Sequence, residues 1–168
     1  MAKKTITITL YMSELIYDVQ NKTYLTGRSR STGNNHEEVA HMQANDDDEN
    51  ANQIARSIGN AFANMKTQLS EFIQSAGTTA NNQLISQTTN LSVELVMPSN
   101  FNQAVNDTVS TAMHQYLVNC AIGDWFTITN KNDAGDYVTL AAANIEEIRN
   151  AINKRVRPTR TPTVTNLP

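Results

Sequence analysis

Residues 48–76 read DENANQIARSIGNAFANMKTQLSEFIQSA, and this stretch decides the fold. Its apolar residues recur at spacings of three and four, which places them on one continuous face of a helix. Acidic residues at 46–49 suit the amino end of a helix, and Gly77 follows where the helix should stop. We therefore expect a long amphipathic helix over residues 48–76 that buries one face in a core.

Two later stretches have the same period. Residues 100–122 carry apolar side chains at helical spacing from Phe101 to Cys120, and residues 134–155 do so from Tyr137 to Ile152. We expect a helix over each range. Gly123 is expected to close or kink the first helix, and the turn-forming residues of 127–136 predict a turn-rich connection to the second.

Two short segments alternate between apolar and polar residues, as half-buried strands do. They are residues 5–10, TITITL, and residues 91–97, LSVELVM. Because an isolated strand leaves its edges unpaired, we expect the two strands to pair with each other. Residues 1–155 are therefore predicted to form a single α+β domain, mainly α, with a three-helix core and a small two-stranded or few-stranded sheet.

The segments between these elements are polar and lead to more local expectations. Ser13 can cap a short helix that Gly27 ends, and residues 28–35, which have no apolar side chain, predict a mobile loop. Residues 78–90 contain only Leu84 and Ile85 as large apolar residues. They predict an exposed loop or an extended arm.

The last segment, residues 156–168, reads VRPTRTPTVTNLP. Its three prolines and four threonines oppose a helix and favour an extended chain. An extended basic arm can dock on another protein, with each arginine reaching a carboxylate or phosphate. Simple disorder is the alternative. The residues predicted to dock are Arg155, Arg157, Pro158 and Arg160.

Charge is distributed unevenly along the chain. The net charge of −3 argues against bulk attraction to nucleic acid or to an anionic membrane. Residues 37–49 are rich in acid, whereas residues 149–160 are basic and contain no acidic side chain. Neighbouring copies could therefore meet through these two segments. No apolar stretch approaches the roughly 18 residues of a membrane span, so no membrane association is expected.

Three motifs approach known sites without matching them. His36 and His41 flank two glutamates, but the second histidine of a zinc-protease helix must lie four residues after the first, where this chain has Ala40. The acids near residue 46 resemble the start of a calcium loop but lack its later glycine and glutamate. Residues 27–33 contain two glycines but no Gly-Lys-Ser/Thr. We therefore expect no catalytic, metal or cofactor site and predict that the chain is not an enzyme.

Individual reactive or aromatic side chains have plain structural interpretations. Cys120, the single cysteine, lies on an apolar helix face and is expected in the core, while His114 falls off that face and is expected at the surface. Trp125 and Phe126 are expected to fix the helix end to the core. Residues 27–33 predict a solvated loop. The functional alternative is a basic finger that contacts an acidic partner or nucleic acid through Arg28 and Arg30.

Two stretches carry a resemblance to a known family. They are LIYDVQNKTYLTGRSR at 15–30, and YLVNCAIGDWF at 116–126 continuing through NKNDAGDY at 130–137 to RVRP at 155–158. With these stretches the chain resembles head–tail connector (neck) proteins of tailed bacteriophages that infect gut Bacteroidetes. The resemblance covers most of the chain and supplies no catalytic residues.

The resemblance implies a structural protein of the virion. Such a protein forms a homo-oligomeric ring at the head–tail junction, assembles in the host cytoplasm, and contacts the portal and other neck or tail proteins. DNA would pass through the ring without sequence recognition. A tail-completion or tail-terminator ring, with more sheet, is the nearest alternative, and a small nucleic-acid-binding regulator is a further one.

Overall fold

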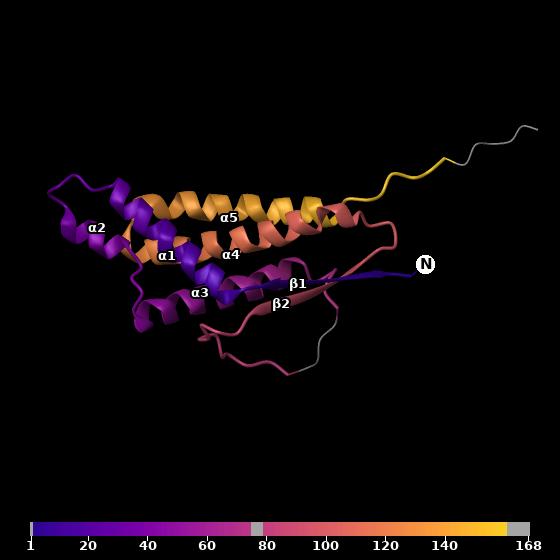
Figure 1. Ribbon diagram of the computed structural model, residues 1–168, viewed down its shortest axis with the longest axis horizontal. Helices are drawn as coiled ribbons and strands as arrows, with labels where there is room; N and C mark the ends of the chain where they lie inside the picture. Colours follow the sequence, from indigo (N-terminus) through magenta and orange to yellow (C-terminus); the bar gives the residue numbers. More distant parts are fainter. Residues whose placement is uncertain (1, 75–78, 161–168) are drawn as a thin grey trace, which may run out of the picture.

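A computed structural model describes residues 2–74 and 79–160 of the chain, and Figure 1 shows their arrangement. Within these residues five α-helices surround a core that also includes a two-stranded sheet, so the predicted α+β class, mainly α, is confirmed. The elements are β1 (Lys4–Leu10), α1 (Met12–Ser29), α2 (His36–Met42), α3 (Asp48–Gln68), β2 (Leu91–Met97), a 3₁₀ turn (Gln103–Val105), α4 (Asn106–Thr129) and α5 (Lys131–Ile152).

Helix α4 is the centre of the molecule. It packs along α5 and also contacts α1, α2, α3 and β1. In Figure 1, α5 covers one side of it, while α3 and the sheet lie on the other. Eleven of its 24 residues are buried, among them Met113, Leu117 and Ile122. A helix with apolar residues on most sides is expected to be covered on most sides, and α4 meets that expectation.

The predicted boundaries of the last two helices were wrong. Helix α4 does not begin near residue 100 or end near Gly123, which lies inside it, where a Cβ would meet Val138 of α5 at 3.5 Å. The expected turn-rich segment at 127–136 is helical except for Asn130, which separates α4 from α5. The amide of Asn130 donates to the carboxylate of Asp133. The turn-forming residues therefore serve as a short junction between two helices.

Helix α3 begins as predicted and ends earlier. The side chain of Asp47 caps it by accepting a hydrogen bond from the backbone N–H of Asn50 at 3.0 Å. The helix stops at Gln68 and not at residue 76. The chain beyond it binds β2 instead, because Phe72 accepts a backbone hydrogen bond from Val96 at 2.6 Å. The predicted stop at residue 77 lies outside the described residues.

The predicted pairing of the two strands is confirmed. β1 and β2 are antiparallel, with a register that runs from Lys4 opposite Met97 to Leu10 opposite Leu91. One face of the sheet is apolar and buried against the helices, whereas the threonines of β1 are exposed on the other face. The buried residues of this face are Ile6, Ile8, Leu10, Val93, Leu95 and Met97.

Helix α1 is longer than predicted, with 18 residues. Ser13 does not cap it, because the helix already starts at Met12, and the N-cap residue Tyr11 makes no side-chain capping hydrogen bond. Gly27 does not end it either. A Cβ on Gly27 would lie 3.0 Å from the backbone oxygen of Val39, so glycine allows α2 to approach α1 closely. The predicted loop at 28–35 is correspondingly shorter, since Arg28 is helical.

Residues 79–90 form neither helix nor strand, as expected for a loop. The loop is attached to the helical body at several points. Leu84 packs on α3, where a Cβ on Gly59 would meet its side chain at 3.2 Å. The side chain of Asn90 accepts a hydrogen bond from the backbone N–H of Met12 at the start of α1.

Candidate functional site

Among the predicted docking residues, Arg155 differs from Arg157, Pro158 and Arg160, because it is bonded to the end of α5 and to the segment before α4. The guanidinium of Arg155 donates to the carbonyl oxygens of Ile152 and Lys154, and Arg155 forms an isolated bridge with Phe101. The backbone N–H of Val156 donates to Asn100 at 2.8 Å. Arg155 therefore anchors the start of the C-terminal arm, residues 156–168. Beyond this anchor, Arg157, Pro158 and Arg160 are exposed.

The structure separates the two arginines of the proposed basic finger. Arg28 is exposed on α1, whereas Arg30 forms an ion pair with Asp133 of α5. The Asp133 side chain is only 7% exposed, compared with 57% for Arg30. The hydrogen bond to Asp133, together with its charge, raises the pKa of the Arg30 guanidinium. Arg30 is thus bound to an acid of its own chain. Of the two arginines, only the exposed Arg28 is left to contact a partner.

The two charged segments lie at opposite ends of the long axis. Figure 1 shows α2 and the start of α3 at one end, and the described part of the C-terminal arm, up to residue 160, leaving from the other. The acidic segment, residues 37–49, has six acidic side chains, and all of them are exposed. They are Glu37, Glu38, Asp46, Asp47, Asp48 and Glu49. The sequence indicated two segments of opposite charge, but only the fold separates them in this way.

The outer face of α1 carries apolar side chains that the sequence analysis did not single out. Tyr17 and Tyr24, two helical turns apart, are 62% and 44% exposed, and Leu25 beside them is 52% exposed. Tyrosine and arginine are enriched in protein interfaces, and Arg28 extends this row by one turn. The seven-residue spacing of the tyrosines, outside the buried stripe, is the signal that could have found this face.

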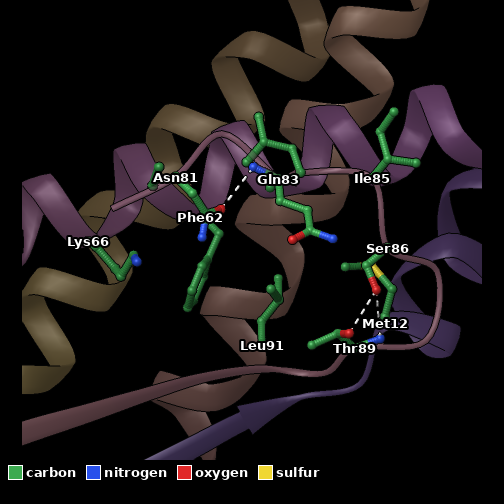
Figure 2. A pocket seen from close by; sticks show the side chains of 12 residues that line it. Met12, Phe62, Lys66, Asn81, Gln83, Ile85, Ser86, Thr89 and Leu91 are labelled. Carbon is green, nitrogen blue, oxygen red and sulfur yellow. Dashed lines mark hydrogen bonds between the residues drawn. The ribbon is translucent and has the colours of Figure 1, made fainter. Parts of the chain in front are cut away.

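A cleft of about 510 Å³ lies between α3 and the loop of residues 79–90. Figure 2 shows Phe62 and Lys66 from α3 on one side and Leu91 of β2 on the other, with the loop passing over them. The ammonium of Lys66 lies 4.9 Å from the centre of the Phe62 ring. Among the described residues, Lys66 is the single charged side chain that lines this cleft, so they bring no acid–base pair together there.

The side chains that could react lie on different helices, with His36 and His41 on α2 and Cys120 on α4. His36 and His41 are exposed on α2, and within the described ranges no three His, Cys, Asp or Glu side chains come close enough to hold a metal ion. Cys120 was expected in the core but is only partly buried and packs against it, and this burial raises the pKa of its thiol. A thiol with a raised pKa is a poor nucleophile at neutral pH.

Two further predictions concern His114 and the aromatic pair Trp125 and Phe126. His114 is not a free surface residue, because its Nε2 atom pairs with Asp18 of α1 at 2.7 Å and its side chain is 21% exposed. This pair joins α4 to α1.

Phe126 is fully buried, and the indole N–H of Trp125 donates to the carbonyl oxygen of Met42 at 2.9 Å. The expectation that these two aromatic residues fix the helix end to the body is confirmed.

No protein-family model matches the chain, and neither a curated protein nor a solved structure is similar to it. The resemblance to phage neck proteins thus stays a prediction. Of the helices in the described part of the chain, none is both long and apolar enough to cross a membrane.

Proposed function

We propose that this chain is a structural protein of a tailed-phage virion that forms a homo-oligomeric ring at the head–tail junction. One observation carries the proposal. The exposed acidic segment lies at one end of the molecule and the basic end, from which residues 157–160 project, at the other. Contacts between unlike ends repeat from copy to copy, and such head-to-tail contacts close into rings when the rotation allows it.

The exposed row on α1 supports an assembly role independently of charge. Tyr17, Tyr24, Leu25 and Arg28 offer aromatic, apolar and bidentate groups on one side of a rigid helix. Aromatic and arginine side chains supply much of the binding energy in protein interfaces. We assign this face to contact with the portal or with another neck or tail protein.

The described residues give less support to the two alternative functions, a tail ring and a nucleic-acid-binding regulator. A tail-completion or tail-terminator ring was expected to contain more sheet, and the described residues contain two strands. A nucleic-acid-binding regulator would need free cations, yet Arg30 is paired with Asp133. DNA passing through the proposed ring needs no sequence-specific contact.

Light scattering of the purified protein at low and high salt tests the ring. We expect a closed oligomer at low salt that weakens as salt rises, because the contact joins opposite charges. Arg157→Glu should weaken it further, whereas Lys131→Glu, a matched reversal at an exposed lysine outside the basic end, should have a smaller effect. A strict monomer that also stays monomeric with portal protein would refute the proposal.

A further inference from the structure

The hydrogen bonds on the far side of β2 fix the orientation of the whole sheet. Val96 donates its backbone N–H to Phe72 at 2.6 Å, and Gln74 donates to the carbonyl oxygen of Glu94 at 3.2 Å. The backbone groups of Glu94 and Val96 therefore point away from β1. In an antiparallel pair, residues alternate between those bonded to the partner strand and those that point away from it.

This alternation determines which groups of β1 point outward. Thr5 and Thr7 lie opposite Val96 and Glu94, so they belong to the non-hydrogen-bonded pairs, and so does Thr9. The N–H and C=O groups of these three threonines point to the free side of β1. Among residues 2–74 and 79–160, none forms a backbone hydrogen bond with that side. β1 is therefore an open edge that can template a further strand.

The C-terminal arm has the sequence pattern of the missing strand. Its threonines occupy every second position, which are Thr159, Thr161, Thr163 and Thr165. Pro158 and Pro162 both fall on the alternate positions. If the threonines face β1, each proline faces outward, where a strand needs no N–H donor. For residues 161–165, which lie outside the described residues, only the sequence is used.

The two faces of the added strand also match those of the sheet. Residues directly opposite each other in neighbouring strands share a face. Threonines of the arm would then lie beside the exposed threonines of β1, and Pro162 and Val164 would extend the apolar face that contains Ile6 and Ile8. One such register places Thr161, Thr163 and Thr165 opposite Thr9, Thr7 and Thr5.

Charge favours an antiparallel direction for the arm. A cleft of about 380 Å³ at the Leu10 end of β1 is lined by Glu14 and by Asp18, which pairs with His114 of the same cleft. An antiparallel arm brings Arg160 to this end, where the guanidinium can reach a carboxylate. The arm then enters from the Leu10 end and runs toward Lys4.

The arm's own anchor argues that it docks on another copy. The arm starts beside the other end of β1, because the ammonium of Lys4 donates to Phe101, which is bridged to Arg155. Seven strand residues span about 20 Å. To add antiparallel to its own β1, the arm would first need about six residues to reach the Leu10 end. Residues 157–160 instead lead away from the body (Figure 1).

We propose that the open edge of β1 binds residues 159–165 of a second copy as a third, antiparallel strand. This inference rests on the proposed ring and adds a backbone contact between successive copies to the contact between their acidic and basic ends. Each copy offers one arm and one edge, so the contact is heterologous and can repeat around a ring.

Proline variants of the full chain test the proposed orientation of the strand. Thr163→Pro removes an N–H that must donate to β1, whereas Val164→Pro removes one that faces outward. Both changes lie outside the residues that the structure describes. We expect Thr163→Pro to weaken self-association about tenfold, since one unmade backbone hydrogen bond is worth roughly that factor. Val164→Pro should associate like the native chain.

Cross-linking distinguishes this contact from the ring itself. In a Cys120→Ala background, a chain with Thr7→Cys is mixed under mild oxidation with a chain carrying Thr163→Cys. Thr5→Cys and Thr9→Cys chains cover neighbouring registers. A disulfide-linked pair is expected, and Val164→Cys, on the opposite face of the arm, should not form one.

The outcomes separate the two proposals. A cross-linked pair without a larger oligomer would support the strand and contradict the ring. A larger oligomer without any cross-link, or one in which both proline variants behave alike, would overturn the strand and leave the ring standing. If a Thr7→Cys, Thr163→Cys double variant closes only within one chain, the arm docks in cis and the proposal is wrong.

Discussion

Arg30, the residue that follows α1, donates two hydrogen bonds to the carboxylate of Asp133 in the first turn of α5. The same carboxylate accepts the side-chain amide of Asn130, the single residue between α4 and α5. Asp133 therefore joins three helices at one end of the molecule.

Asp133→Ala should lower the free energy of unfolding by about 1–3 kcal/mol, because the buried amide of Asn130 loses its acceptor. Asp136→Ala removes an exposed acid in the same helix and should change stability by less than about 0.5 kcal/mol. Urea denaturation followed by circular dichroism measures both. Equal losses in the two variants would contradict this role for Asp133.

Gly27→Ala should destabilise the protein by about 1–3 kcal/mol, because the added Cβ would lie 3.0 Å from the backbone oxygen of Val39 and α2 would have to move. Gly135→Ala is the control. Its Cβ would meet no atom within 4 Å, so the better helix propensity of alanine should stabilise α5 by up to about 1 kcal/mol. Hydrogen exchange should show faster exchange in α2 for the first variant alone.

Asp47→Ala should cost about 0.5–2 kcal/mol, since the first turn of α3 loses the side chain that accepts the N–H of Asn50. Asp46→Ala removes the same charge one residue earlier without removing this bond. Thermal unfolding of the two variants separates capping from the general effect of charge, and an equal shift in Tm would argue for charge alone.

Stability should fall at high pH. Burial raises the pKa of Tyr116 to about 12 from an ordinary value of 10.0, and burial also raises the pKa of Cys120. Both groups are neutral when protonated, and the folded state holds their protons more tightly. Their contribution is complete below the ordinary pKa values and is lost as pH rises through the folded ones.

The measurement is urea denaturation at pH 8, 10 and 11.5. Tyr116→Phe should reduce the loss of stability between pH 10 and pH 11.5. If the loss is as steep without the tyrosine hydroxyl as with it, other groups cause it.

The parts of the fold that the sequence predicted are those governed by local period. The alternation in 5–10 and 91–97 was enough to predict both strands, and their pairing followed because each needed a partner. The helical stripes of α3, α4 and α5 were found for the same reason. Their ends were not, because ends depend on contacts with distant residues.

The end of α3 shows why. Leu69, Phe72 and Ile73 keep the helical period, yet Ile73 bridges Leu95 of β2, and no local pattern predicts that contact. Likewise, His114 looked free because its partner Asp18 lies 96 residues earlier in the sequence. The separate fates of Arg28 and Arg30 also depend on a distant residue, Asp133.

The pairing of β1 with β2 has a consequence for synthesis. Ile6 leaves the ribosome before its partner Leu95, which is made 89 residues later. β1 therefore waits, unpaired and half apolar, until β2 is made, and the pairing of the two strands is slow because residues 11–90, which contain α1, α2 and α3, lie between them. During that interval the growing chain is most exposed to aggregation through this strand, so its expression should respond to chaperone supply and to the rate of translation.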